Sequence, residues 1–243
     1  MFFIESATFK PPLTDLHHIL KQYWGFDAFR PQQQDIIEAV MEGKDALALM
    51  PTGGGKSLCY QVPALAQEGI CIVISPLIAL IKDQVEALRK KGVLALAIYS
   101  GMSRRQIAQT LKNAAYGDYK FLYVSPERLE TSLFLEFLPA LQVNLVAVDE
   151  AHCISQWGYD FRPSYLRIAA LREELHDVPF LALTASATPV VQKDICEKLL
   201  LRTPQIFQQP FARPNLSYSV LRAEAKQAKL VQVVSKVPGT AIV

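Results

Sequence analysis

Three consecutive glycines followed by a lysine and a serine form the segment of this sequence best suited to bind phosphate. They lie in Met50-Pro-Thr-Gly-Gly-Gly-Lys-Ser57, between an apolar run and a helical pattern. Consecutive glycines let the backbone wrap closely around phosphate oxygens, so that several N–H groups point inward at the start of a helix. The lysine supplies charge to the β- and γ-phosphates, and the serine hydroxyl can bind Mg²⁺. We therefore predict a phosphate-binding loop made by Thr52, Gly53, Gly54, Gly55, Lys56 and Ser57.

The loop matches the pattern G-x-x-x-x-G-K-[ST] except at its first position, where Met50 replaces glycine. This departure matters little if the position only closes the entry of the loop. A glycine-rich turn that merely caps a helix is the alternative. The strand-like run before the loop favours the phosphate site.

Two adjacent carboxylates, Asp149 and Glu150, are the second feature suited to chemistry. They follow the apolar run Leu145–Val148 and open the tetrapeptide Asp-Glu-Ala-His. A strand-end aspartate beside a phosphate loop can hold Mg²⁺, and the neighbouring glutamate can orient and deprotonate the attacking water. Adjacent buried carboxylates are costly without a cation, which favours a metal over a surface acidic turn. We predict nucleotide hydrolysis with Lys56, Asp149 and Glu150 as catalytic residues, and Ser57 and Asp149 as Mg²⁺ ligands.

The elements that position these residues alternate between short apolar runs and longer helical patterns. The runs are Ala46–Met50, Ile70–Ser75, Leu94–Tyr99, Phe121–Val124, Leu145–Val148 and Phe180–Leu183. Each is nearly continuous in Val, Ile, Leu or Ala, as expected for strands covered on both faces. The helical patterns are Pro31–Met41, Ser57–Ala66, Leu77–Lys91, Arg104–Ala114 and Pro189–Leu200. We predict an α/β fold with a mostly parallel sheet, helices on both faces and ligands at the carboxyl ends of the strands.

Composition is typical of a folded protein without a membrane span. The 243 residues are 51% hydrophobic and carry a formal charge of +2, so overall charge does not indicate a nucleic-acid partner. The first residues do not resemble a secretory signal, and the longest apolar stretches are strand-sized. The four cysteines are scattered, which disfavours a zinc site and favours a reducing compartment: Cys59, Cys71, Cys153 and Cys196. We expect a soluble, cytoplasmic protein, associated with the nucleoid if it is bacterial.

The pattern changes after Leu201. A polar, proline-containing stretch, residues 203–215, is interpreted as a connection. The final residues, Gly239-Thr-Ala-Ile-Val243, are typical of the opening of a buried strand. We interpret the sequence as a fragment cut at the start of a second domain; the alternative is a natural C-terminal edge strand.

Several longer segments resemble the RecQ family of superfamily 2 DNA helicases. They are Met50–Gln61, Ser75–Gln84, Asp149–Gly158 and Asp160–Pro163, and the resemblance extends from about Trp24 to Leu216. It implies a RecA-like P-loop domain as the first helicase lobe (residues 1–207), then a linker and the truncated start of a second lobe (residues 208–243). It also implies ATP and Mg²⁺ as cofactors and single-stranded and forked DNA as partners. The implied activity is ATP hydrolysis coupled to 3′-to-5′ translocation and duplex unwinding in DNA repair and recombination.

The resemblance places an adenine-binding segment at Phe26, Arg30 and Gln33. Phe26 and Arg30 would sandwich the base, because an aromatic ring and a planar guanidinium suit stacking. Gln33 would read the edge of the base, since its amide both donates and accepts. Many relatives carry tyrosine in place of Phe26, so stacking survives here and a hydroxyl contact is lost. Core packing is the alternative for Phe26 and Phe29.

By the same resemblance, two turns at strand ends hold single-strand phosphates. They are Ser75-Pro-Leu77 and Ser125-Pro-Glu-Arg128, and the residues assigned to DNA binding are Ser75, Pro76, Ser125 and Arg128. Backbone N–H groups at helix starts bind phosphates readily. Serine and proline before a helix are also ordinary capping residues, which is the alternative.

An aromatic loop peculiar to the resembled family follows the acidic motif. Trp157 and Phe161 would stack on unpaired bases, and Gln156 and Arg162 belong to the same DNA-binding and coupling set, with Arg162 joining the strand to the ATP site. The alternative is a loop pinned to the core by Trp157.

Three more residues, His152, Thr184 and Ser186, are assigned by resemblance to the coupling of hydrolysis with movement. A Ser/Thr run such as Thr184–Thr188 is also a common helix cap, and His152 could simply be a buried, hydrogen-bonded histidine. The segment Phe211–Leu216 resembles the entry to the second lobe.

Two other functions stay open. One is an RNA-dependent ATPase of the same superfamily, which the acidic motif and the aromatic loop disfavour. The other is a nucleotide-gated binding module that recruits partners without hydrolysis, which Lys56, Asp149 and Glu150 disfavour. In the resembled family, an arginine of the second lobe completes the ATP site and contributes orders of magnitude in rate. We therefore expect this chain to bind nucleotide, to hydrolyse it slowly and not to unwind DNA alone.

Overall fold

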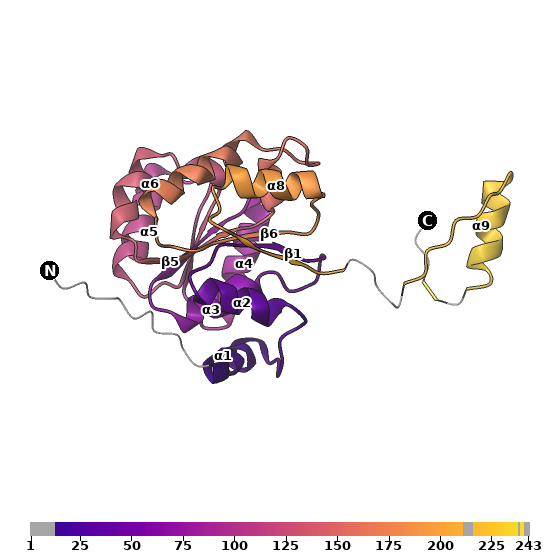
Figure 1. Ribbon diagram of the computed structural model, residues 1–243, viewed down its shortest axis with the longest axis horizontal. Helices are drawn as coiled ribbons and strands as arrows, with labels where there is room; N and C mark the ends of the chain where they lie inside the picture. The colour runs from indigo at the N-terminus through magenta and orange to yellow at the C-terminus, as the bar shows by residue number, and fades with distance from the viewer. Residues whose placement is uncertain (1–12, 211–215, 238, 241–243) are drawn as a thin grey trace. The chain divides into compact units, whose positions relative to one another are not determined.

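A seven-stranded parallel sheet forms the centre of the larger of two compact units in the computed structural model (Figure 1). The structure describes residues 13–210, 216–237 and 239–240, and the units are Met1–Pro210 and Phe211–Val243. The strands are β1 (Ala46–Leu49), β2 (Ile70–Ile74), β3 (Ala95–Ile98), β4 (Phe121–Val124), β5 (Val143–Val148), β6 (Phe180–Thr184) and β7 (Gln205–Gln208). Their order is β3-β4-β2-β5-β6-β1-β7, and every pairing is parallel. The predicted α/β fold with a parallel sheet is confirmed.

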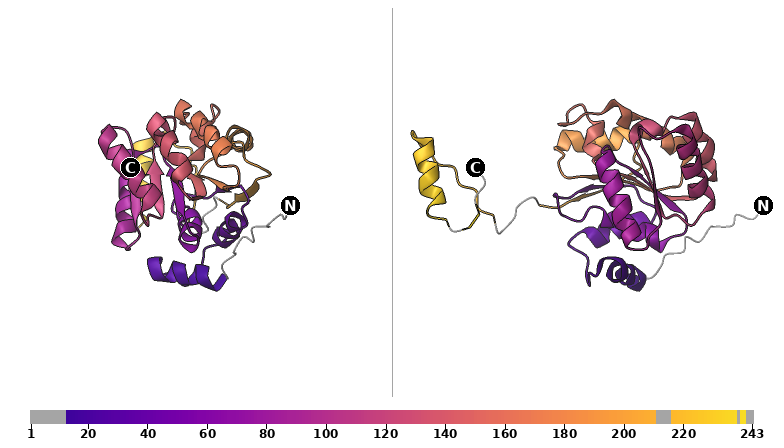
Figure 2. Two further views of the ribbon diagram at one scale, coloured as in Figure 1. Left: turned by 90° about the vertical axis from the view of Figure 1, so that its left-hand side faces the viewer. Right: turned by 180° about the vertical axis from the view of Figure 1, so that it is seen from behind.

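Successive side chains along each strand enter two different cores, one on each face of the sheet. In β2, Ile72 and Ile74 join one core, and Cys71 and Val73 join the other. The first core is covered by α5 (Arg104–Tyr116), α6 (Ser132–Phe137) and α8 (Pro189–Lys198), and the second by α2 (Gln33–Met41), α3 (Leu58–Ala66) and α4 (Ile78–Lys90). Figures 1 and 2 show these helices on both sides of the sheet. Burial on both faces explains why the strands are continuously apolar.

Shorter helical turns complete the first unit. They are η1 (Pro126–Arg128), η2 (Leu138–Ala140), η3 (Ala151–Ile154), η4 (Pro163–Ala170) and α7 (Leu171–Glu174). Both η3 and η4 follow β5, and buried Ile154, Tyr165 and Ile168 place them against the first core. The acidic motif leads into η3, and the aromatic loop lies between η3 and η4.

Helix α1 (Leu13–Trp24) forms an outer layer over α2 and α3 (Figure 1). Its Leu16 and Leu20 pack in a separate small core with Ile37, Met41, Leu58 and Val62. The sequence patterns do not include this helix. Its apolar face is narrow, because Leu16 and Leu20 are the fully buried positions among its described side chains.

The edge strand β7 corrects the interpretation of residues 203–215 as a connection. It pairs in parallel with β1 along its whole length. Its sequence hides it, because two glutamines flank Ile206 and Phe207, and Ile206 is 53% exposed. Only Phe207 of this strand packs against a core. Backbone pairing with a single neighbour therefore defines this strand, and an apolar pattern could not indicate it.

The second unit contains helix α9 (Lys226–Val234), none of whose residues is buried. This helix was not predicted. Of the expected strand opening at Gly239–Val243, the structure describes only Gly239 and Thr240, and residues 211–215 of the expected lobe entry lie outside the described residues. In the described part of the chain, no helix combines the length and apolarity that a bilayer span requires.

The strand order gathers the predicted site residues along one edge of the sheet. The strands β4, β2, β5, β6 and β1 are successive neighbours, and being parallel they all end at this edge. Four of them lead directly into Met50, Ser75, Ser125 and Asp149, and β6 ends on Thr184. The fold therefore brings five motifs that are far apart in the sequence onto one surface.

Candidate active site

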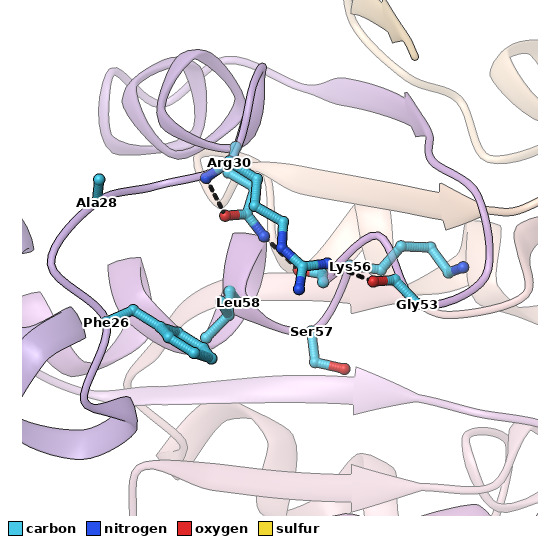
Figure 3. Close-up of a pocket in the computed structure, with 9 residues that line it drawn as sticks. Phe26, Ala28, Arg30, Gly53, Lys56, Ser57 and Leu58 are labelled. Atoms are coloured by element: carbon cyan, nitrogen blue, oxygen red, sulfur yellow. Dashed lines mark hydrogen bonds between the residues drawn. The ribbon is translucent and has the colours of Figure 1, made fainter. Parts of the chain in front are cut away.

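A pocket of about 490 Å³ lies over the glycine-rich loop (Figure 3). It is lined by Phe26, Ala28, Arg30, Gln33, Gly53, Gly55, Lys56, Ser57 and Leu58. The structure thus brings seven of the nine predicted nucleotide-binding residues to one cavity. The other two, Thr52 and Gly54, belong to the same loop without lining this pocket. The volume lies in the range of pockets that hold small organic ligands.

The loop backbone requires its glycines. Gly53 and Gly55 have φ angles of +77° and +81°, which side chains with a Cβ rarely adopt. A Cβ on Gly54 would lie 2.8 Å from the carbonyl oxygen of Pro51. Met50, at the position of the missing first glycine, is fully buried, and it is not among the described residues with positive φ. The departure from the motif therefore leaves the shape of the loop intact.

Gln33 binds the loop from the side. Its Nε2 donates to the carbonyls of Gly55 (3.0 Å) and Gly54 (3.3 Å), and its Oε1 accepts from the backbone N–H of Arg30 (2.8 Å). The side chain is 1% exposed. Both ends of the amide are therefore engaged within the protein. Reading the edge of a base would require Gln33 to exchange at least one of these bonds.

Arg30 and Phe26 reach into the same pocket from the segment before α2 (Figure 3). Arg30 Nη1 also donates to the carbonyl of Gly53. Phe26 is 49% exposed, so core packing does not account for it. Phe29 does follow the core alternative, because it packs against the small core under α1 and lies edge-on to His17, with ring centroids 4.9 Å apart.

Lys56 links the loop to the acidic motif. Its Nζ donates to the carbonyl of Met50 (3.3 Å), so the ammonium lies over the end of β1. Burial and the charge of Glu150 raise the pKa of Asp149 to about 6, while the backbone N–H of Glu150 and the charge of Lys56 act to lower it. The ends of β1 and β5 lie at the same edge of the sheet with one strand, β6, between them, which places Lys56 and Asp149 on the same side of the fold. The arrangement therefore has the geometry of a site for a charged phosphate and a cation.

Glu150 and His152 connect this site to the end of β6. His152 Nδ1 lies 3.3 Å from Glu150 Oε2 and 2.9 Å from Thr184 Oγ1. Thr184 is fully buried, and its Oγ1 accepts from the backbone N–H of Ser186 (3.2 Å). Tyr165, from η4, donates to the backbone carbonyl of Asp149 (2.9 Å). A continuous set of polar contacts thus joins the acidic motif to Thr184 and Ser186.

The donor set around Asp149 is incomplete for a metal held by protein alone. Within the described ranges, no group of three or more His, Cys, Asp or Glu side chains is placed to bind a metal ion. A Mg²⁺ ion favours few carboxylates together with phosphate oxygens and water. Ser57 and Asp149 are compatible with that pattern, because one hydroxyl and one carboxylate at the same edge of the sheet leave the other positions to phosphate and water.

A second cluster of polar side chains joins the ends of β3 and β4. Ser125 Oγ donates to Glu127 Oε1 (2.6 Å), and Ser100 Oγ donates to the same oxygen. Burial acts to raise the pKa of Glu127, but the two hydroxyl hydrogen bonds, a backbone hydrogen bond and the charge of Arg128 together lower it. The Ser125 hydroxyl proton is therefore engaged by Glu127, and Ser125 itself is buried. The role of Glu127 depends on Ser100 from another segment, so the Ser-Pro pattern around it does not indicate it.

Ser75, Pro76 and Arg128 complete this surface. Ser75 is 2% exposed, and its Oγ has no hydrogen-bond partner among the described residues. Pro76 accepts from Arg162 Nη1 at 3.1 Å. Arg128 lines a separate pocket of about 240 Å³ together with Arg104 and Thr131, and its Nε is also unpartnered in the described part of the chain.

The aromatic loop stands away from the core. Trp157 is 74% exposed and Tyr159 is 95% exposed, so the alternative of a loop pinned by Trp157 is wrong. Gln156 is exposed and Phe161 is half-buried. Arg162 fixes the far end of the loop through Asp160 (2.8 Å) and Pro76. Tyr159 was missed in the sequence analysis, although it lies in the same aromatic-rich segment.

Comparisons with known proteins agree with this geometry. A family described as DEAD/DEAH box helicase matches residues 30–195. The chain is 49% identical over 210 residues to the ATP-dependent DNA helicase RecQ of Bacillus subtilis (strain 168), covering 86% of this chain and 36% of that protein. It is 41% identical over 234 residues to the probable ATP-dependent DNA helicase RecS of the same organism, covering 95% and 47%. A putative ATP-dependent RNA helicase of Acanthamoeba polyphaga mimivirus is 41% identical over 232 residues, with 94% and 42% covered.

The chain therefore spans less than half of the length of these relatives. Among solved structures, the helicase MrfA bound to DNA and AMPPNP is similar with a TM-score of 0.65 at 16% identity, covering 91% of this chain and 34% of that chain. The Pyrococcus furiosus Hef helicase domain has a TM-score of 0.58 at 21% identity, covering 74% and 38%. At these identities the likeness extends to the fold alone, and the neighbours are helicase domains.

Proposed function

Because the chain belongs to the DEAD/DEAH box helicase family and is similar to RecQ helicases, we propose that it is the first, ATP-binding lobe of a RecQ-type DNA helicase. The whole protein would hydrolyse ATP to move 3′ to 5′ along single-stranded DNA and to open forked duplexes during repair and recombination. The observation that carries this proposal is that the loop of Lys56 and the acidic motif of Asp149 follow strands ending at the same edge of the sheet, beside a pocket lined by Phe26 and Arg30.

Each residue of the loop and the acidic motif has a defined task in this proposal. The N–H groups of the loop and Ser57 hold the triphosphate, and Lys56 leaves the carbonyl of Met50 to contact it. Bound Mg²⁺ would neutralise phosphate charge, with Ser57 and Asp149 as its protein ligands. Glu150 orients the attacking water and accepts its proton. Phe26 and Arg30 hold the adenine by stacking.

DNA binding is assigned to the ends of β2, β4 and β5, along the same edge of the sheet as the phosphate loop. Ser75, Pro76, Ser125 and Arg128 would line the path of the DNA backbone, with the Ser75 hydroxyl and the Arg128 guanidinium as the donors to phosphate. Trp157, Phe161 and the added Tyr159 would offer faces on which unpaired bases stack. The contacts of His152 with Glu150 and Thr184 would transmit occupancy of the ATP site to Ser186 and the DNA surface, and Gln156 and Arg162 would do so through the aromatic loop.

An RNA-directed ATPase is the second candidate, because one relative is named as a putative RNA helicase. Release of phosphate from ATP should be measured for the whole protein without nucleic acid, with single-stranded DNA, and with RNA of the same sequence, because this chain on its own is expected to hydrolyse ATP slowly. We expect stimulation by DNA to exceed stimulation by RNA. The reverse order would favour the second candidate.

The same assay tests the hydrolytic assignment. Glu150→Gln should lower the rate at least about 100-fold, because the water loses its base, while the MgATP dissociation constant changes less than about threefold. Glu136→Gln, an exposed glutamate on α6, serves as the control and should keep the wild-type rate. Unchanged turnover in Glu150→Gln would leave a nucleotide-gated binding module as the better account.

A further inference from the structure

Lys91, which follows the last residue of α4, is bonded to the end of α1. Its Nζ donates a 2.7 Å hydrogen bond to the backbone carbonyl of Tyr23, and it lies 5.8 Å from the ring centroid of Trp24. Tyr23 and Trp24 are the last two residues of α1. Carbonyls in the last turn of a helix have no helical partner and form the negative end of its dipole, so a cation suits this place. Lys91 thus adds a polar tie to the last turn of α1, where Tyr23 and Trp24 also pack against the second core and the small core.

This last turn leads directly into Phe26. Gly25 has a φ of +73° and donates its N–H to the carbonyl of Lys21 at 2.9 Å. Lys21 also forms an ion pair with Asp27 at 2.8 Å. Phe26 therefore lies between two residues that are both tied to α1. Since Phe26 belongs to none of the three apolar cores of the described residues, its direction depends on this turn.

The body of α1 is held by different contacts. Leu16 and Leu20 are buried in the small core with α2 and α3, and Lys91 does not take part in that core. Loss of the Lys91 side chain would therefore remove the polar tie on the last turn of α1, while Leu16 and Leu20 keep the helix docked. The effect would be confined to the segment that carries Phe26.

We propose that Lys91 is a positioning residue for nucleobase recognition: it holds the end of α1 so that the ring of Phe26 enters the pocket opposite Arg30. The inference rests on the proposed function, because it presupposes that the pocket takes ATP. The inference goes beyond the proposed function, because it assigns a role to the residue directly after the C-terminal end of α4, outside the phosphate loop and the adenine-binding segment. Lys91 acts through Phe26 and touches no nucleotide atom.

The test compares a nucleotide with a ligand that lacks the base. Calorimetry should give dissociation constants of the chain for ATP and for inorganic tripolyphosphate, both with Mg²⁺. Lys91→Met removes the donor and keeps an apolar stem, and it should weaken ATP binding roughly threefold to tenfold, as expected for one partly screened charged hydrogen bond. Tripolyphosphate binding should be unchanged, because the loop that holds phosphate is untouched.

Two matched variants separate position from charge. Lys90→Met removes the neighbouring cation, which pairs with Glu86 inside α4 at 2.6 Å, and should bind ATP like the wild type. Lys91→Arg keeps a donor that can reach the same carbonyl and should restore wild-type affinity.

The outcomes distinguish this inference from the proposed function. If Lys91→Met binds ATP as tightly as the wild type, or weakens ATP and tripolyphosphate by the same factor, Lys91 has no positioning role. If instead the wild type binds tripolyphosphate as tightly as ATP, the base pocket itself is wrong, and the nucleotide assignment fails before Lys91 is considered.

Discussion

At the scale of single residues, Glu150 has a backbone conformation that needs an explanation. Its φ and ψ of +48° and +45° lie in the left-handed region, at a cost of about 1–3 kcal/mol for a residue other than glycine. The carbonyl of Glu150 accepts from the N–H of Cys153 at 2.9 Å, and its carboxylate contacts His152. Backbone strain of this kind is typical of sites where a side chain must face one direction. In the proposed mechanism, that direction is toward the water beside the γ-phosphate.

The exposed aromatic side chains of Trp157 and Tyr159 are expected to contribute to DNA affinity and not to stability. Trp157→Ala should weaken binding of a single-stranded DNA oligonucleotide by about 1–3 kcal/mol, because one stacking surface is lost. The free energy of unfolding should stay within about 0.5 kcal/mol, since the side chain is 74% exposed. Fluorescence anisotropy at fixed salt and urea unfolding measure the two quantities.

Tyr116 provides the matched control for this experiment. It is 76% exposed on α5 and lies in none of the assigned motifs, so Tyr116→Ala should leave DNA affinity unchanged. Equal loss in Tyr116→Ala and Trp157→Ala would mean that any exposed aromatic residue contributes. Wild-type affinity in both Trp157→Ala and Tyr159→Ala would remove the aromatic loop from the DNA surface.

At the scale of elements, Asp45 fastens the amino ends of three neighbouring strands. It precedes β1, and its carboxylate accepts from the backbone N–H groups of Phe180 (2.8 Å) and Arg202 (2.6 Å), which lie at the start of β6 and shortly before β7. It also forms a 2.7 Å ion pair with Arg172, whose guanidinium lies 3.8 Å from the ring centroid of Phe180. Both charged side chains are largely buried. The end of the sheet opposite the candidate site is therefore held by one carboxylate.

Removing this carboxylate should destabilise the fold without touching the site. Asp45→Ala leaves the buried charge of Arg172 without a counter-ion and two N–H groups without an acceptor, and should lower the free energy of unfolding by about 3–5 kcal/mol. Urea unfolding measures the change, with Asp177→Ala as an exposed control. The double variant Asp45→Ala/Arg172→Met should recover part of the loss, because no charge is left unpaired. A loss below about 1 kcal/mol in Asp45→Ala would contradict this account.

For most strands, the sequence pattern is sufficient to predict the element. The six apolar runs correspond to β1 to β6 with ends within two residues, because strands buried on both faces must be continuously apolar. β7 was not predicted, because its backbone hydrogen bonds with β1 form whatever side chains β7 carries. α1 was not predicted, because two leucines are enough to pack it against other helices and give no broad apolar pattern.

In the candidate site, too, some residues could be predicted from the sequence and others could not. The loop glycines and the Asp149-Glu150 pair were predictable, because their chemistry depends on local order along the chain. Three other features depend on tertiary contacts. Gln33 donates to loop carbonyls, Glu127 accepts from two hydroxyl groups, and Lys91 donates to the end of α1. No spacing rule within one segment could indicate these contacts.

At the scale of the whole molecule, the first unit holds every assigned residue, from Phe26 to Ser186. Its sheet order places the phosphate loop and the acidic motif two strands apart, with β6 between them. The formal charge of the chain is only +2, so attraction to nucleic acid must come from the local surface at the strand ends. The chain spans less than half of the RecQ and RecS relatives, so unwinding is proposed for the whole protein.

The central claim is that Lys56 and Asp149 act on one Mg²⁺-bound triphosphate. The most direct measurement is the calorimetric affinity for ATP with and without Mg²⁺, in the wild type, Lys56→Ala, Asp149→Asn and the double variant. Mg²⁺ should tighten ATP binding at least about tenfold in the wild type and far less in Asp149→Asn. The losses in Lys56→Ala and Asp149→Asn should be non-additive, because both groups meet the same ligand. Full Mg²⁺ enhancement in Asp149→Asn, with strictly additive losses, would contradict the claim.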